Sequence, residues 1–312
     1  MKRLTWTLVV VGLFVAAASA HETRGETVWY PMPDEAYLFG TRYPEAQRVL
    51  FAFDYGHALV YERLLVDRGK IDDPEAYERR VLAEIQNVIA HPPATKQDEA
   101  DIAPNYVFTF PLVLNMMDWS HLLHQFVLDV LSTSQDRGPA LVERVRQIHA
   151  QYAAKPAVAI TSSCKSMVYM DGQYFSKAFR RTYPSLNLLI WSYHWFQIHL
   201  FEALMAPTQP ARDQGVADTL RRFRALIADL PDSADFDDMP DTAVEAPVFS
   251  RTFPFLASAF DNNHMLHDIV SDILTSDRVA DSAVRAEGQR MARMDLDPLA
   301  YQVPCKIPGG NP

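Results

Sequence analysis

One short pattern recurs along this chain and limits what it can fold into. The pattern is an apolar residue, Asp, two variable residues, His, an apolar residue and Leu. It occurs three times, as Asp54-x-x-His57, Asp118-x-x-His121 and Asp261-x-x-His264. Residues three apart on a helix share one face, so each copy would present a carboxylate and an imidazole on the same side.

A fourth copy is degenerate, with Trp191 in the place of the Asp before His194. The histidines at 57, 121, 194 and 264 are separated by 64, 73 and 70 residues. Apolar segments that carry the pattern alternate with more polar, amphipathic ones. This alternation predicts an all-α protein: a helical bundle or helical toroid built from repeated helical hairpins, whose inner apolar helices carry His and Asp.

Hydrophobic periodicity, prolines and turn residues set the expected elements. Helices are predicted over 46–68, 73–90, 107–132, 139–153, 185–205, 210–230, 254–275 and 277–294. We expect a charged loop at 94–105 and a short strand at 157–160. Residues 46–294 are interpreted as a single helical domain, and residues 295–312 as an irregular tail.

The first twenty residues have the features of a secretory signal peptide. Lys2 and Arg3 precede an apolar stretch at 8–17, and Ala18-Ser19-Ala20 is a typical cleavage signal. We therefore expect an exported protein, periplasmic or secreted, without a stable membrane anchor after cleavage, and with an N-terminal arm at 21–45. Cleavage after Ala20 would leave His21 first, where its α-amino group and imidazole could chelate copper.

Cys164 and Cys305 are the two cysteines of the chain. An oxidising compartment favours a disulfide between them, which would tie the C-terminal tail to the middle of the chain. Thiolate metal ligands and cysteine-based catalysis are the alternatives.

The charge of the chain restricts its partners. The formal net charge is −10, and no Lys/Arg cluster offsets it, which argues against nucleic acid as a partner. The sequence has no glycine-rich nucleotide loop and no C-x-x-C-H haem attachment motif. A small-molecule substrate is the remaining expectation, and the sequence leaves the oligomeric state open.

The histidines and carboxylates of the apolar helices are candidate metal ligands. They are His57, His121, His124, His194, His199, Glu202, His264, His267, Asp54, Asp118 and Asp261. Such a set fits a transition metal, namely iron, copper or zinc, better than calcium or magnesium. His194 and His199 are five residues apart, so we expect either His194 or the His199/Glu202 pair to face the site.

Several functions fit these residues. The leading hypothesis is an exported metal-dependent redox enzyme with an iron or copper centre that acts on a small molecule. A zinc-dependent hydrolase with the same ligands and a non-enzymatic metal or haem carrier are alternatives. The Asp residues could instead be helix N-caps, with histidines that serve only the core or metal-free acid/base catalysis.

Overall fold

The computed structural model describes residues 37–228, 230 and 239–305. These residues contain fifteen α-helices and no strand, which confirms the all-α helical bundle. All of them belong to one compact unit, Pro33–Pro312. The segment 1–20, predicted to be a signal peptide, and His21 lie outside the described residues. Within the described part of the chain, no helix combines the length and apolar character that crossing a membrane would need.

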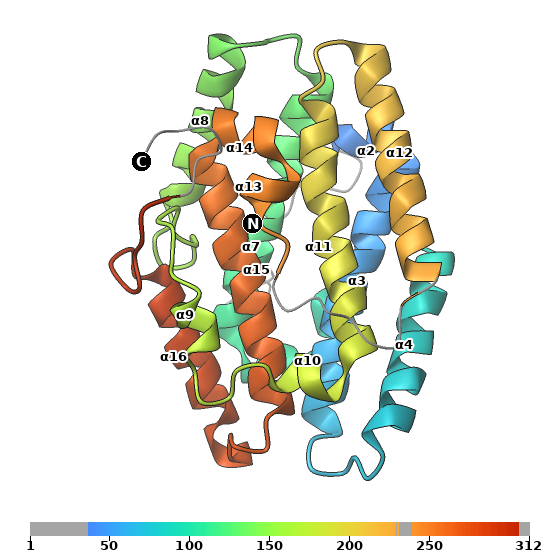
Figure 1. The fold of residues 1–312 in the computed structure, drawn as a ribbon, viewed down its shortest axis with the longest axis vertical. Helices are drawn as coiled ribbons and strands as arrows, with labels where there is room; N and C mark the ends of the chain where they lie inside the picture. The colour runs from blue at the N-terminus through green and yellow to red at the C-terminus, as the bar shows by residue number, and fades with distance from the viewer. Residues whose placement is uncertain (1–36, 229, 231–238, 306–312) are drawn as a thin grey trace, which may run out of the picture. The chain divides into compact units, whose positions relative to one another are not determined.

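Four long helices form the centre of the bundle and carry the four copies of the pattern. They are α3 (Pro44–Val66), α7 (Pro111–Thr133), α11 (Pro184–Leu204) and α15 (Pro254–Thr275). Each of α3 and α7 packs against both α11 and α15, and the axes of all four lie roughly along the long axis of the bundle (Figure 1). Their inward faces therefore meet inside the bundle.

A shorter and more polar helix follows each central helix along the chain. These helices are α4 (Pro74–Ala90), α8 (Pro139–Ala153), α12 (Gln209–Ala228) and α16 (Val284–Leu296). Each packs against the central helix that precedes it (Figure 1). The described chain thus alternates between inner and outer helices, while the internal repetition of the sequence stays a prediction.

Each central helix begins at a proline that follows a buried aromatic residue. The aromatic residues are Tyr43, Phe110, Tyr183 and Phe253. Proline suits the first turn of a helix because the N–H that it lacks would have no partner there. The same aromatic residue also ends a short preceding helix. These short helices are α2 (Leu38–Arg42), α6 (Pro104–Thr109), α10 (Ala178–Thr182) and α14 (Pro247–Thr252).

A carboxylate lies eighteen residues after each of these prolines and accepts backbone N–H bonds at or beside the start of a short helix. The four are Glu62, Asp129, Glu202 and Asp272. Glu62 on α3 accepts from the backbone of α6, and Asp129 on α7 accepts from that of α2. Glu202 on α11 accepts from the backbone of α14, and Asp272 on α15 accepts from that of α10. Each central helix thus bonds the short helix that precedes another central helix, at equivalent positions, which favours the predicted repeat.

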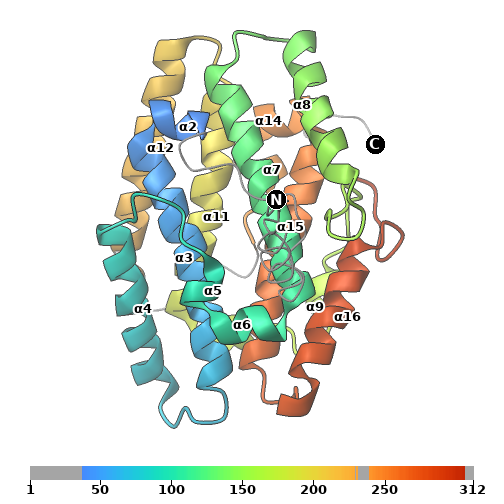
Figure 2. The same cartoon turned by 180° about the vertical axis from the view of Figure 1, so that it is seen from behind.

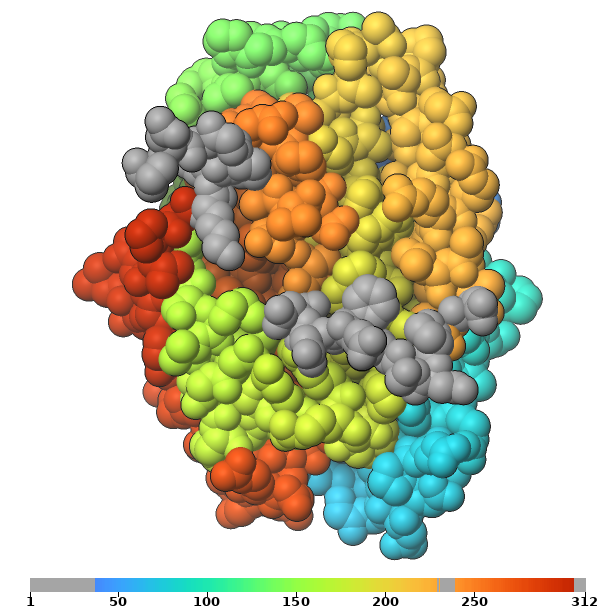
Figure 3. Space-filling model, viewed as in Figure 1, coloured from blue at the N-terminus to red at the C-terminus, as the bar shows by residue number. Residues whose placement is uncertain are grey.

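Three further helices complete the fold, together with a 3-10 turn at Asp281–Ala283. They are α5 (Glu99–Ile102), α9 (Val168–Asp171) and α13 (Thr242–Glu245). Figure 2 shows α5 and α6 lying across the lower part of the bundle, where both contact α3 and α6 also contacts α7. On the opposite face, α13 and α14 pack against α15, and their side chains form part of the surface in Figure 3.

The structure differs from the sequence prediction at five places. The described end of the arm, residues 37–45, is helical because α2 and the start of α3 lie there. The segment 94–105 contains α5, and the helix predicted over 107–132 is interrupted at Phe110 by the proline that follows it. No strand forms at 157–160, and the last helix begins at Val284 rather than at 277.

The predicted disulfide between Cys164 and Cys305 is confirmed, with the two Cα atoms 5.1 Å apart. The backbone N–H groups of Val303 and Ser166 donate to the carbonyls of Cys164 and Tyr301, at 2.9 and 2.7 Å. The bridge therefore holds the described end of the irregular tail beside the segment that leads to α9.

Candidate metal centre

Six imidazoles from all four central helices converge inside the bundle. They are His57 on α3, His121 and His124 on α7, His194 on α11, and His264 and His267 on α15. The shortest separations between ring centroids are 4.3 Å for His194–His264 and 4.6 Å for His57–His267. The next is 5.2 Å for both His57–His194 and His194–His267. Side chains that are far apart in the sequence thus share one internal site.

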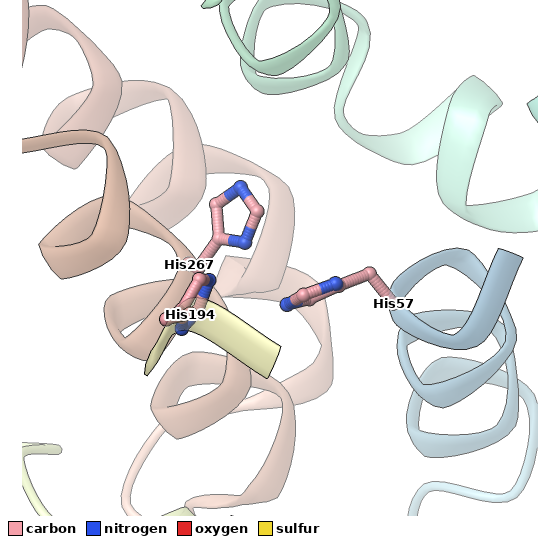
Figure 4. Close-up of side chains that lie close together, drawn as sticks. All are labelled: His57, His194 and His267. Atoms are coloured by element: carbon pink, nitrogen blue, oxygen red, sulfur yellow. The ribbon is translucent and has the colours of Figure 1, made fainter. Parts of the chain in front are cut away.

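His57, His194 and His267 form the tightest group, which we call the three-histidine cluster. Each offers one ring nitrogen, and the three nitrogens lie within 4.8 Å of one another. Figure 4 shows the three rings, which come from α3, α11 and α15, turned toward a common point. All three side chains are buried. This spacing suits a single ion bound by imidazoles from three helices.

Most ring nitrogens of the cluster have no hydrogen-bond partner among the described residues. This holds for both nitrogens of His194 and His267 and for Nε2 of His57. Nδ1 of His57 lies 3.2 Å from the carbonyl oxygen of Phe53. A buried polar atom without a partner costs about 1–3 kcal/mol, so several in one place call for a ligand. The donor set therefore fits a metal ion.

Burial keeps these imidazoles neutral. It lowers the pKa of His57 to about 3. Burial also lowers the pKa values of His194 and His267 well below the usual range, and the neighbouring imidazoles lower them further. Neutral imidazole is the form that binds a metal, so the cluster needs no proton release to accept one.

The central helices show a register that the sequence pattern missed. Ten residues after the first proline of each helix lie Asp54, His121, His194 and His264. Thirteen residues after it lie His57, His124, Gln197 and His267. His57 is therefore equivalent to His124 and His267, and not to His121 as the Asp-x-x-His pattern suggested. The matching aromatic-proline pairs were the sequence signal for the correct register.

The alternative in which the Asp residues cap helices is wrong. Asp54, Asp118 and Asp261 all lie inside helices that begin seven to ten residues earlier. None of the three belongs to the three-histidine cluster. Asp261 accepts hydrogen bonds from the backbone N–H and the hydroxyl of Thr242, at 3.1 and 2.6 Å. Burial raises the pKa of Asp261 to about 7, although these hydrogen bonds lower it.

Asp54 and Asp118 lie beside His121 in a second group, which we call the carboxylate cluster. Oδ1 of Asp54 is 3.5 Å from Nδ1 of His121. One ligand atom each from Glu99, Asp118 and His121 lies within 4.8 Å of the others. Sequence reasoning missed Glu99 because it occurs in a charged stretch without helical periodicity. Burial raises the pKa of Asp54 to about 6, and that of Glu99 well above its usual value.

Helix α11 directs His194, and not His199 or Glu202, into the site. Nε2 of His199 lies 2.9 Å from Oε2 of Glu245, and the ring packs on Trp195 at 4.0 Å between centroids. Glu202 accepts the backbone N–H bonds of α14. Both side chains therefore have structural partners away from the three-histidine cluster.

A cavity of about 250 Å³ adjoins one side of the imidazole group. It lies where α13, α15 and the disulfide-bonded segments meet. Its lining includes Met167, Met265, Asp261 and His264. The ring of His264 is 4.3 Å from that of His194, so the cavity ends next to the three-histidine cluster.

The chain was also compared with known proteins. No protein family, curated protein or solved structure matches it. The geometry of the two clusters and the cavity is therefore the basis for a functional proposal.

Proposed function

We propose that this protein is an exported metal-dependent redox enzyme, with iron or copper bound by His57, His194 and His267, that acts on a small molecule. One observation carries the proposal: three neutral imidazoles from three helices are buried together, with most of their nitrogens unpartnered among the described residues. Purely structural histidines would be expected to have hydrogen-bond partners.

The donor types favour a transition metal. Imidazole suits iron, copper and zinc, whereas calcium and magnesium prefer oxygen ligands. A bound iron or copper ion would supply one-electron chemistry at this position. The ring of Phe53 is 5.2 Å from that of His194 and 4.7 Å from that of Tyr193. These packed rings exclude bulk water from the inner side of the site.

The cavity beside His264 is where we place the small molecule. A volume of about 250 Å³ admits only a small substrate, and the methionines of the lining favour an apolar one. Asp261 on the same wall is held by Thr242, and its raised pKa makes it a weaker acid than an exposed carboxyl. A small, neutral and largely apolar molecule fits this lining.

Export rests on the signal peptide predicted at 1–20, and the Cys164–Cys305 disulfide supports an oxidising compartment. The test is to fractionate cells that express the full chain and to sequence the N-terminus of the mature protein. We expect a processed chain outside the cytoplasm that begins at or near His21. A full-length chain retained in the cytoplasm would contradict export.

The same three histidines are a common zinc ligand set, which makes a zinc-dependent hydrolase the second candidate. Metal analysis together with optical and electron paramagnetic resonance spectra of the exported protein separates the two functions. Iron or copper at about one ion per chain supports redox chemistry, and zinc alone supports hydrolysis. A bound metal without turnover of any tested substrate points to a carrier, while a chain that binds no metal contradicts all three.

His267→Gln is the matched variant for this test. Gln197 occupies the equivalent place on α11, thirteen residues after its first proline, so glutamine is compatible with this place in a central helix. We expect the variant to fold and to lose the metal of the three-histidine cluster. Retention of that metal at wild-type affinity would contradict the assigned ligands.

A further inference from the structure

We infer that Glu99, Asp118 and His121 bind a second divalent cation, adjacent to the three-histidine cluster. This site goes beyond the proposed function, because the two ligand sets share no residue. The ligand atoms of the three side chains lie within 4.8 Å of one another. They come from α5 and α7, and Figure 2 shows the face on which these helices lie.

His121 gives an independent indication of a ligand. Its side chain is only 9% exposed, yet neither ring nitrogen has a hydrogen-bond partner among the described residues. Its Nδ1 lies 3.5 Å from Oδ1 of Asp54, which is longer than a hydrogen bond of normal strength. An imidazole buried in this way beside carboxylates is suited to donate a lone pair to a cation.

The charges of the carboxylate cluster also call for a cation. Asp54, Glu99 and Asp118 interact with one another, and Glu99 and Asp118 share a hydrogen bond. The ammonium of Lys96 lies 3.8 Å from Oδ1 of Asp118. Three ionised carboxylates and one ammonium leave two negative charges, which a divalent cation would balance.

A corresponding region elsewhere in the protein shows the arrangement without this excess charge. Asp261 on α15 occupies the position of Asp118 on α7, seven residues after the first proline. Thr242 lies twelve residues before the proline of α15, as Glu99 does before the proline of α7. The Thr242 hydroxyl donates to Asp261 at 2.6 Å. The α15 region therefore has one carboxylate bonded to a hydroxyl, whereas the α7 region has two carboxyl groups that face each other.

The donor set indicates the class of cation. Two carboxylates and one imidazole form a harder set than three imidazoles, and such sets suit manganese and iron(II). The ring of His121 is 5.5 Å from that of His267, so the two clusters adjoin. The second cation would therefore lie next to the ion of the three-histidine cluster and could act on the same substrate.

The test measures how many metal ions bind to the metal-free mature protein. Co²⁺ probes both sites by equilibrium dialysis and elemental analysis, and Mn²⁺ probes the carboxylate cluster by electron paramagnetic resonance. The variants are Glu99→Thr, which copies the Thr242 region, and His267→Gln. Asp101→Asn is the matched control, because Asp101 is an exposed carboxylate on the same short helix. Circular dichroism melts establish that each variant is folded.

We expect two Co²⁺ ions per chain in the wild type and in Asp101→Asn, one in each of the two other variants, and none in their combination. Glu99→Thr should also weaken Mn²⁺ binding by about 100-fold or more. A single Co²⁺ that is lost in His267→Gln and unaffected by Glu99→Thr would overturn the second site and leave the proposed function intact. A single Co²⁺ that is lost in Glu99→Thr and unaffected by His267→Gln would support the second site and contradict the three-histidine cluster. A wild type that binds no Co²⁺ would contradict both.

Discussion

The Glu99–Asp118–His121 region and the Thr242–Asp261–His264 region use one backbone arrangement for two different purposes. Asp98 and Asp241 cap α5 and α13 in the same way, each accepting the N–H two residues later at 2.8 Å. In one region the hydroxyl of Thr242 donates a hydrogen bond to the half-buried carboxylate of Asp261. In the other, a glutamate leaves a negatively charged group that needs a proton or a cation. A single side chain therefore separates a structural hydrogen bond from a candidate metal site.

Thr242→Glu should break this comparison with the largest effect. It would place a second carboxyl group against half-buried Asp261, which lacks a lysine equivalent to Lys96 in the contacts described. We expect about 3 kcal/mol of destabilisation in the presence of a chelator, because an unpaired charge is buried. Urea denaturation measures this change. Saturating Mn²⁺ should restore part of the loss, and wild-type stability in chelator would contradict the comparison.

The pH dependence of stability sharpens the account of Asp261. Its folded pKa of about 7 lies above the usual value of 3.8 for an aspartate, so the folded state retains a proton that the unfolded chain has lost. Its contribution to stability is therefore present at low pH and declines as the pH rises from about 4 through about 7. Asp261→Asn should flatten this decline by about 2 kcal/mol between pH 5 and 7.5. Denaturation curves across that range provide the measurement, and an unchanged slope in the variant would rule the explanation out.

Lys96→Met should have the smallest effect of the series. The ammonium of Lys96 competes with any cation bound near Asp118, because both neutralise the same carboxylates. Removing it should tighten Mn²⁺ binding by about 10-fold, which corresponds to about 1.4 kcal/mol. Titration of the metal-free variant tests this expectation. Weaker Mn²⁺ binding would mean that Lys96 helps to build the site instead of competing for it.

Much of the fold could be predicted because its helices have local signals. The 254–275 helix agrees with α15 at both ends, since a proline begins it and apolar residues recur at helical spacing throughout. The disulfide was predictable because the chain has one cysteine pair. The short helices were missed because four to six residues carry too little periodicity, and their ends are satisfied by carboxylates distant in the sequence, such as Glu62 and Asp272.

The candidate site was predictable in residue type but not in grouping. The pattern identified histidines on four apolar helices. It nevertheless aligned His57 with His121, because Asp-x-x-His begins ten residues after the first proline in α3 but seven residues after it in α7 and α15. Glu99 had no pattern at all, and only the folded chain brings it to Asp118 and His121. His199 resembled a ligand until its partner Glu245 was known. Which polar groups meet depends on tertiary packing, and local spacing does not encode it.

The central claim is that His57, His194 and His267 bind one metal ion. The most direct measurement is the anomalous diffraction of crystals of the purified protein, recorded on both sides of the absorption edge of the metal found by elemental analysis. The account predicts an anomalous peak within about 2.0–2.2 Å of one ring nitrogen of each of the three histidines. Crystals of metal-loaded protein with no peak between these rings, or with a peak bound by other residues alone, would contradict it.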